Sequence, residues 1–396
     1  MRWASAVSDE PSLEAAVTAC AERVTTGLEG ASPDLAVVFV SPHFAADYKR
    51  VPDLLRERLG PALLLGCSAG GVIGGGHEVE HRPGLSLTAG SLPGVDIRPM
   101  RADDARLPDP DAGPHKWEEL TGVSRNAGPQ FVLLADPFSI RMEELLMGLD
   151  YAYPESPKVG GMASGGDRPG TNALYLGDEV HRGGLVGVAL TGDVVVDTIV
   201  AQGCRPIGKP MEITKCEQNL LLEVDGRPPL QVLQELYERA DPGDRELFQR
   251  SLFLGVVMDE LQEEHRLGDF LIRNLYGIDR ESGGFLVGSA LREHQTVQFH
   301  LRDAQTASDD LRAMLAQYLT EHNPASAHGA LLFSCLGRGS YLYGQPDHDT
   351  GLFSEHLGPV PLGGFFCNGE IGPVSGATYL HGYTSSFGIF RPRRGD

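Results

Sequence analysis

The sequence predicts an α/β protein in which mixed β-sheets are covered by helices, in two pseudo-repetitive halves, residues 1–209 and 210–396. Three observations predict this class. Continuous apolar runs, typical of strands buried on both faces, alternate with apolar residues at helical spacing. Glycine clusters follow such runs at three places. A chain of 396 residues is also too long for one typical core, so two domains are expected.

The N-terminal region contains the first copy of a recurring order: strand, helix, strand, glycine cluster and hairpin. A preceding helix begins after Ser12, a favourable N-cap residue. The expected elements are a helix at 12–29, a strand at 35–41, a helix at 48–60, a strand at 62–71 and a hairpin strand at 84–90.

The same order returns twice. The second copy has expected elements at 130–137 (strand), 141–153 (helix), 158–166 (strand entering glycines), 171–178 and 183–192 (hairpin strands). The third has them at 329–339 (strand), 350–358 (helix), 361–372 (strand entering glycines) and 377–390 (closing strands). The clusters at 66–76, 160–166 and 363–372 are therefore expected at equivalent strand ends.

A different stretch separates the second and third copies. It is expected to contain a strand, a turn and a helix over 219–240, two strands over 269–291 and a helix over 308–322 with Ser308 as its N-cap. The segment Arg205–Met211, with two prolines and two glycines, marks the expected domain boundary.

The chain is strongly acidic, because 33 Lys and Arg against 54 Asp and Glu give a net charge of −21. Such a charge repels nucleic-acid backbones and anionic lipid surfaces, so neither is an expected partner. The six cysteines contain no C-x-x-C pair, no secretory signal precedes them, and no apolar run reaches membrane-spanning length. A cytoplasmic protein with reduced thiols is expected.

Residues 66–70, Gly-Cys-Ser-Ala-Gly, fit the G-x-S-x-G nucleophile elbow of serine hydrolases. An elbow requires a helix directly after the serine. Five glycines among residues 70–76 disfavour that helix, since each costs about 1 kcal/mol against alanine. At the expected cognate positions, Ala163-Ser164 and Cys367-Asn368, a serine is not maintained in every copy. Ser68 is therefore interpreted as a ligand-site residue rather than a nucleophile, and no catalytic residue is assigned.

The C-terminal region concentrates side chains suited to a small ligand. Arg338 offers a planar cation that can hold a carboxylate through two hydrogen bonds. An alternative is an Arg338–Glu370 ion pair that braces the glycine loops. The predicted ligand-binding residues are Ser68, Cys335, Arg338, Phe365, Phe366, Cys367, Asn368, Glu370 and His381.

Two stretches carry a family resemblance. Cys335-Leu336-Gly337-Arg338-Gly339 and Gly364-Phe365-Phe366-Cys367-Asn368-Gly369-Glu370-Ile371-Gly372-Pro373, followed by His381, resemble the C-terminal domain of the FIST family (F-box and intracellular signal transduction). Residues 37–44 and 63–76 resemble its N-terminal domain. The resemblance implies a sensory module that binds a small molecule such as an amino acid. Because the two halves occupy the whole length, signalling is expected to pass through a separate partner.

Several alternatives stay open at this point. Some FIST relatives resemble haem-binding gas sensors, and His348, His356, His381 or a cysteine would be the axial ligand here. A hydrolase using Ser68 or a thiol enzyme using Cys335 or Cys367 is a further alternative. No metal site is assigned, because His77 and His81 lie in a charged, glycine-rich loop where solvation is expected.

Overall fold

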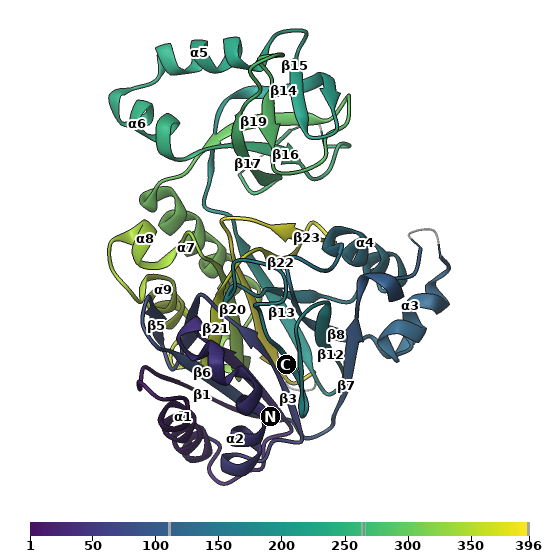
Figure 1. The fold of residues 1–396 in the computed structure, drawn as a ribbon, viewed down its shortest axis with the longest axis vertical. Coiled ribbons are helices and arrows are strands. Elements are labelled where there is room, and N and C mark those ends of the chain that lie inside the picture. Colours follow the sequence, from purple (N-terminus) through teal and green to yellow (C-terminus); the bar gives the residue numbers. More distant parts are fainter. Residues whose placement is uncertain (110–111, 263, 266, 394–396) are drawn as a thin grey trace. The chain divides into compact units, whose positions relative to one another are not determined.

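The computed structural model describes residues 1–109, 112–262, 264–265 and 267–393 (Figure 1). The chain divides into two compact units. The first contains residues 1–200, 312–380 and those from Thr384 onward, and the second contains residues 201–311 and 381–383. These bounds differ from the expected segments 1–209 and 210–396. The difference arises because the second unit is inserted into the third copy of the repeat that builds the first.

The first unit contains three copies of one element order. The first copy comprises β1 (Arg2–Ser8), α1 (Leu13–Gly27), β2 (Leu35–Val40), η1 (Pro42–Arg50), α2 (Val51–Arg58), β3 (Leu63–Ser68), β4 (Gly71–Gly74), β5 (His77–Glu80) and β6 (Leu85–Ser91). The second comprises β7 (Val95–Ala102), η2 (Asp104–Arg106), α3 (Pro114–Thr121), η3 (Arg125–Ala127), β8 (Gln130–Ala135), α4 (Met142–Ala152), β9 (Lys158–Met162), β10 (Leu174–Leu176), β11 (Glu179–His181) and β12 (Leu185–Gly192).

The third copy is interrupted after its first strand. It comprises β13 (Val195–Ala201) and, after the insertion, α7 (Ala304–Glu321), η4 (Pro324–Ser326), β20 (Gly329–Cys335), α8 (Gly339–Tyr343), α9 (His348–Leu357), β21 (Leu362–Cys367), β22 (Glu370–Val374), β23 (Ala377–His381) and β24 (Ser385–Arg391). The predicted class, α/β with mixed sheets covered by helices, is confirmed.

Each copy builds a six-stranded mixed sheet around one parallel pair, and the copies exchange hairpins. The parallel pairs are β2–β3, β8–β9 and β20–β21. The hairpin of the second copy joins the first sheet, that of the third joins the second sheet, and that of the first joins the third sheet. The strand orders are β1-β6-β2-β3-β10-β11, β23-β22-β9-β8-β12-β7 and β13-β24-β20-β21-β4-β5. The exchange places residues of all three copies beside one another.

The buried strands divide their side chains between two cores. Along β2, Val37 and Phe39 join a core shared by all three sheets, and this core includes Val132 and Phe333. The intervening Ala36, Val38 and Val40 face a separate core under α1 and α2. This alternation explains why the strand is apolar throughout, because both of its faces are covered.

In its described residues, the second unit forms a small closed sheet, helices α5 and α6, and the beginning of α7. Its elements are β14 (Arg205–Glu217), β15 (Leu220–Val224), α5 (Pro229–Arg239), α6 (Pro242–Arg250), β16 (Leu252–Val257), β17 (Phe270–Ile278), β18 (Phe285–Val287) and β19 (Thr296–Leu301). The strands close in the order β14-β15-β18-β17-β16-β19.

One predicted helix boundary is wrong. Helix α7 begins at Ala304, so Ser308 lies inside it. The capping side chain is that of Asp303, whose Oδ1 accepts the N–H of Thr306 at 2.7 Å. Asp and Ser are comparable N-cap residues, and the local sequence offers both.

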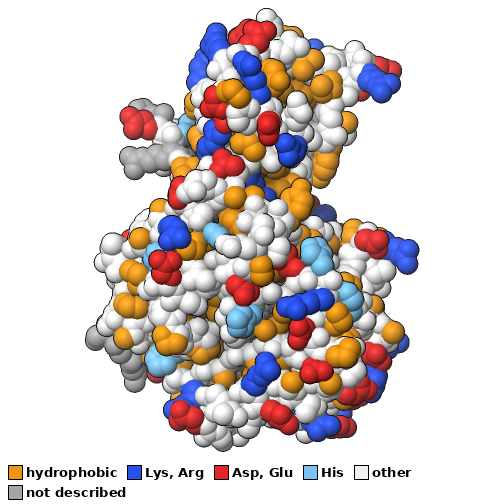
Figure 2. Space-filling model, turned by 90° about the vertical axis from the view of Figure 1, so that its left-hand side faces the viewer, with side chains coloured by type: hydrophobic (Ala, Val, Ile, Leu, Met, Phe, Trp, Pro, Cys, Tyr) orange, Lys and Arg blue, Asp and Glu red, His pale blue; other side chains and the backbone are white. Residues whose placement is uncertain are grey.

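Charged side chains of both signs lie on the surface of the protein. Figure 2 shows acidic and basic side chains interspersed over the visible face, with apolar side chains between them. Within the described residues, no helix combines the length and the apolar composition needed to cross a membrane.

Candidate functional site

The three glycine clusters meet at the carboxyl ends of the parallel strands. Ser164, after β9, donates its hydroxyl to the carbonyl of Phe366 in β21 and accepts the N–H of Gly70 at 2.8 Å. The N–H groups of Ser164 and Gly165 donate to the carbonyl of Ser68 at 3.2 and 3.3 Å. The predicted placement of these clusters at equivalent strand ends is therefore confirmed. We call this meeting point the strand-end junction.

Strand register corrects which residues are equivalent. Ser68, Met162 and Phe366 lie opposite Val40, Ala135 and Ser334, each the sixth residue of its parallel neighbour. The cognates of Ser68 are thus Met162 and Phe366, not the expected Ala163-Ser164 and Cys367-Asn368.

Three equivalent glycines let the parallel strands approach. Gly66, Gly160 and Gly364 each face a carbonyl of the neighbouring strand. A Cβ atom at these positions would lie 2.1, 1.8 and 1.9 Å, respectively, from that oxygen. A glycine is required in the same place in every copy, so these glycines are structural.

Arg338, which follows β20, is completely buried and faces a carboxylate of its own chain. Its Nε donates to Oδ2 of Asp349 at 2.7 Å and its Nη2 donates to Oδ1 at 3.1 Å. Nη2 also donates to the hydroxyl of Tyr343 at 2.6 Å. Asp349 additionally accepts the hydroxyl of Ser385 at 2.7 Å. The partner of Arg338 is therefore Asp349, whereas the sequence interpretation proposed a ligand carboxylate or Glu370.

Electrostatics hold this pair in its charged form. Burial alone would raise the pKa of Asp349 and lower that of Arg338, but the attraction between them outweighs burial. The pKa of Asp349 thus lies well below its usual range and that of Arg338 above it. Nη1 of Arg338 has no hydrogen-bond acceptor among the described residues. One donor of a buried cation therefore stays available.

Glu370 and Cys335 bind the backbone of Thr384, and Cys367 lies beside Cys335. Oε2 of Glu370 accepts the N–H of Thr384 at 3.1 Å, and the carbonyl of Thr384 accepts the N–H of Cys335 at 3.0 Å. Cys335 is paired in register with Cys367 on the adjacent parallel strand. Burial, followed by the charge of Glu370, raises the pKa of Cys367 well above its ordinary value. Cys367 is thus a thiol at neutral pH, which disfavours it as a nucleophile.

The remaining predicted residues are dispersed. Phe365 belongs to the shared core, where it stacks on Phe39 at 4.5 Å, so it does not form an open wall. Phe366 is buried at the strand-end junction, and Asn368 is exposed there with its N–H bound to the carbonyl of Met162 at 3.0 Å. His381 is buried but belongs to the second compact unit.

Ser68 is part of a buried hydrogen-bond chain. Its hydroxyl donates to Oδ1 of Asn172 and accepts the N–H of Ala173, both at 3.0 Å. Nδ2 of Asn172 donates to Oδ1 of Asp136 at 2.9 Å. The chain continues from β3 into strand β4 rather than into a helix. An amide oxygen is not a base, so this arrangement lacks the geometry of a nucleophile elbow.

We expect Ser68→Ala to destabilise the protein by about 1–3 kcal/mol, because a buried amide oxygen and a buried N–H lose their shared partner. Urea unfolding followed by tryptophan fluorescence measures this loss. A fluorophosphonate probe is expected to leave Ser68 unlabelled. Labelling that disappears in Ser68→Ala would contradict the structural role.

The sequence analysis did not identify several residues that contact Arg338 or Asp349. We call Arg338, Asp349, Tyr343, Ser334 and Ser385 the Arg338 cluster. Asp349, Tyr343, Ser334 and Ser385 are polar residues whose partners lie on other elements. The available signal was Asp349 itself, an acidic residue directly before the helix expected at 350–358. That position is typical of an N-cap, so an acidic residue there is expected to cap the helix and not to form a buried ion pair.

The sequence analysis also did not identify Glu78, a residue of the first copy that forms hydrogen bonds with the third copy. This residue lies on β5 and is 3% exposed. Its carboxylate accepts the N–H groups of Thr350 and Asp347, both at 3.1 Å, and its own N–H donates to Asp347 at 2.6 Å. Figure 1 shows β5 beside α9. Burial, followed by the charge of Asp349, raises the pKa of Glu78 to about 7.

This raised pKa predicts a pH dependence. A carboxyl group with a folded-state pKa above its unfolded value stabilises below the unfolded pKa, and that stability is lost as pH rises through the folded value. Between pH 4.5 and 8 we expect Glu78 to contribute a loss of about 2–3 kcal/mol. The difference between wild type and Glu78→Gln, measured by urea unfolding across this range, isolates the effect. Parallel pH profiles for the two proteins would contradict it.

The proposed haem ligands are engaged in the fold. Nδ1 of His356 is hydrogen-bonded to the carbonyl of Leu352 at 2.8 Å. His348 contacts Asp349 through Nδ1 at 3.1 Å and stacks on Tyr343 at 3.5 Å. Neither residue lines the cavity of about 540 Å³ at the beginnings of β1, β20 and β21. These contacts do not by themselves favour a haem site, which stays a prediction.

Comparisons with known families find two domains along the chain. A model of the FIST N domain matches residues 34–227, and a model of the FIST C domain matches residues 229–373. The chain belongs to the FIST family. FIST domains are associated with sensory and signal-transduction functions.

Individual FIST relatives span bacteria and a plant. Uncharacterized protein Rv0628c of Mycobacterium tuberculosis is 36% identical over 98% of this chain and 100% of its own length. Uncharacterized protein Mb0898c of Mycobacterium bovis is 36% identical over 98% of this chain and 99% of its own. The F-box/LRR-repeat protein At5g63520 of Arabidopsis thaliana is 23% identical over 76% of this chain and 66% of its own. A cyanuric acid hydrolase structure from A. caulinodans aligns over 99% of both chains with 8% identity and a TM-score of 0.37, too distant to bear on function.

Proposed function

We propose that this FIST protein is a cytoplasmic sensor that binds a small molecule, with an amino acid as the first candidate, and acts through a separate signalling partner. The observation that carries the proposal is the Arg338 cluster. A fully buried guanidinium retains one nitrogen, Nη1, without an acceptor among the described residues. A buried donor of this kind favours an anionic acceptor such as an amino-acid carboxylate.

The cluster also offers a way to convert binding into a conformational change. Tyr343, whose hydroxyl accepts from Nη2, ends the five-residue helix α8. Tyr341 in the same helix is 82% exposed. Because Arg338 is completely buried, a carboxylate reaches Nη1 only if the surrounding chain moves, and we propose that α8, which holds Tyr343, is the part that moves. The displaced surface is then available to a partner.

Isothermal titration calorimetry with the twenty amino acids and with small dicarboxylates tests the proposal. We expect at least one compound to bind wild type and to bind Arg338→Lys about tenfold or more weakly, because an ammonium cannot reproduce the planar fork. Glu370→Gln is the matched control, since its amide oxygen can still accept the N–H of Thr384. Titrations are made where circular dichroism shows that each variant is folded.

Equal affinity of a bound compound for wild type and Arg338→Lys would end the assignment of this site. Absence of binding by every compound would reject the amino-acid class. Titration with hemin tests the alternative cofactor, since a shifted Soret band that is lost in His348→Ala or His356→Ala would favour a haem sensor.

A further inference from the structure

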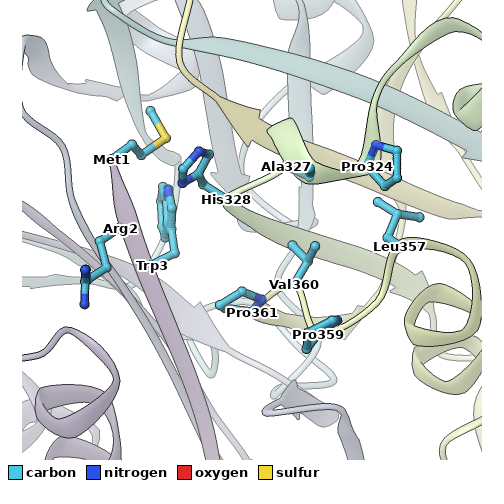
Figure 3. A pocket seen from close by; sticks show the side chains of 11 residues that line it. Met1, Arg2, Trp3, Pro324, Ala327, His328, Leu357, Pro359, Val360 and Pro361 are labelled. Atoms are coloured by element: carbon cyan, nitrogen blue, oxygen red, sulfur yellow. The ribbon is translucent and has the colours of Figure 1, made fainter. Parts of the chain in front are cut away.

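A cavity lies in the first unit, at the opposite ends of the parallel strands from the strand-end junction. Its volume is about 540 Å³ and it is bordered by the beginnings of β1, β20 and β21 (Figure 3). The wall is mainly apolar and includes Pro324, Leu357, Pro359, Val360 and Pro361. Cavities of this size and lining accommodate small molecules with an apolar body.

Trp3 provides a buried hydrogen-bond donor at this cavity. The residue is 4% exposed, and its Nε1 has no acceptor among the described residues. Figure 3 shows the nitrogen-bearing end of the indole beside His328 and Met1, which line the same cavity. A buried N–H without an acceptor is costly, so this donor favours a ligand that carries an acceptor.

The indole cannot turn away from this position. A Cβ atom on Gly329 would lie 2.4 Å from Cγ of Trp3, and one on Gly90 would lie 3.0 Å from the indole ring. Phe390 packs against the ring with a centroid separation of 4.6 Å. Close packing of this kind fixes the direction of the N–H.

One basic side chain, that of His328, stands beside the indole at this cavity. Arg2 also lines the cavity, but Figure 3 shows its side chain directed away from the indole, and it pairs with the exposed Glu29. Because Arg2 and Trp3 are neighbours in β1, their side chains lie on opposite faces of the strand, and Arg2 is not assigned to the ligand site. His328 is held by its backbone N–H, which donates to the carbonyl of Phe390 at 2.9 Å.

We infer that this cavity binds a small apolar carboxylic acid. The carboxylate accepts the indole N–H of Trp3 beside His328, while the apolar body lies against Val360 and the surrounding prolines. This site is separate from the Arg338 cluster and does not depend on the function proposed for that cluster.

The probe is 4-phenylbutyrate, and 4-phenylbutylamine is its matched control with the same apolar body. In a Trp117→Phe background, Trp3 is the remaining tryptophan of the two in the chain, so its emission reports binding directly. We expect 4-phenylbutyrate to bind with a Kd of about 10 μM to 1 mM, as its size allows. The amine is expected to bind at least tenfold more weakly, although a chain of net charge −21 attracts cations.

Two variants locate the site, with calorimetry as the readout. Trp3→Phe keeps an aromatic ring and removes the donor, and Val360→Glu places a negative charge on the wall. Each is expected to weaken binding of 4-phenylbutyrate by about tenfold or more. Leu261→Glu adds the same charge at a residue that is 92% exposed, and it is expected to leave binding unchanged.

Three results would overturn the inference. They are the absence of 4-phenylbutyrate binding to wild type, equal affinity for the amine, and unchanged affinity in both site variants. A dimer seen by light scattering that Val360→Glu converts to a monomer would instead identify the cavity as a contact between copies.

Discussion

Replacing Gly364 with alanine is expected to destabilise the first unit by about 3 kcal/mol or more, among the largest effects of a single methyl group. The new Cβ would lie 1.9 Å from the carbonyl oxygen of Leu332, and the backbone φ of +153° is one that L-residues rarely adopt. Gly160→Ala is expected to behave alike, because its Cβ would lie 1.8 Å from the oxygen of Leu133 at a φ of +154°. The clash between the new Cβ atom and the carbonyl oxygen is relieved only if the parallel strands move apart.

Urea unfolding followed by tryptophan fluorescence measures the effect, since both tryptophans, Trp3 and Trp117, lie in the first unit. Gly351→Ala is the matched control. This glycine lies in α9 with no heavy atom within 4 Å of an added Cβ, so the change should stabilise by about 0.5–1 kcal/mol. A loss of less than about 1 kcal/mol in Gly364→Ala would show that the strands can move apart at little cost.

Asp349→Ala is expected to destabilise the first unit by about 3–5 kcal/mol, because it leaves the fully buried guanidinium of Arg338 without its counter-ion. The side chains of Arg338 and Asp349 are 0% and 3% exposed, so water cannot replace the lost charge. The hydroxyl of Ser385 loses its acceptor as well. The same unfolding measurement at pH 7 gives the magnitude.

The double variant Arg338→Met, Asp349→Leu provides the control for this pair. Removing both charges leaves no isolated ion, so its stability loss is expected to be smaller than the sum of the two single losses. Additive losses would mean that the two groups act independently, which contradicts the bidentate geometry. Glu370→Gln should change stability little, because Arg338 is paired with Asp349 and not with Glu370.

The sequence by itself determined the elements and the family. Fully apolar runs such as Leu35–Val40 specify strands covered on both faces, and all six residues are buried. The recurrence of strand, helix, strand and glycines predicted equivalent strand ends, because each copy follows the same local rules of pattern and turn. The motif around Arg338 and Asn368 was sufficient to suggest the FIST family.

Only the tertiary structure decided how the copies combine and which charges pair. Hairpin strands such as β4 and β5 satisfy their hydrogen bonds equally well on any sheet edge, so their local pattern does not show that they join the sheet of the third copy. Arg338 is separated by 11 residues from Asp349 and by 32 residues from Glu370, and sequence spacing offers no basis for choosing between them. The choice rests on α9, which places Asp349 within 2.7 Å of the buried guanidinium, where the nearer opposite charge dominates.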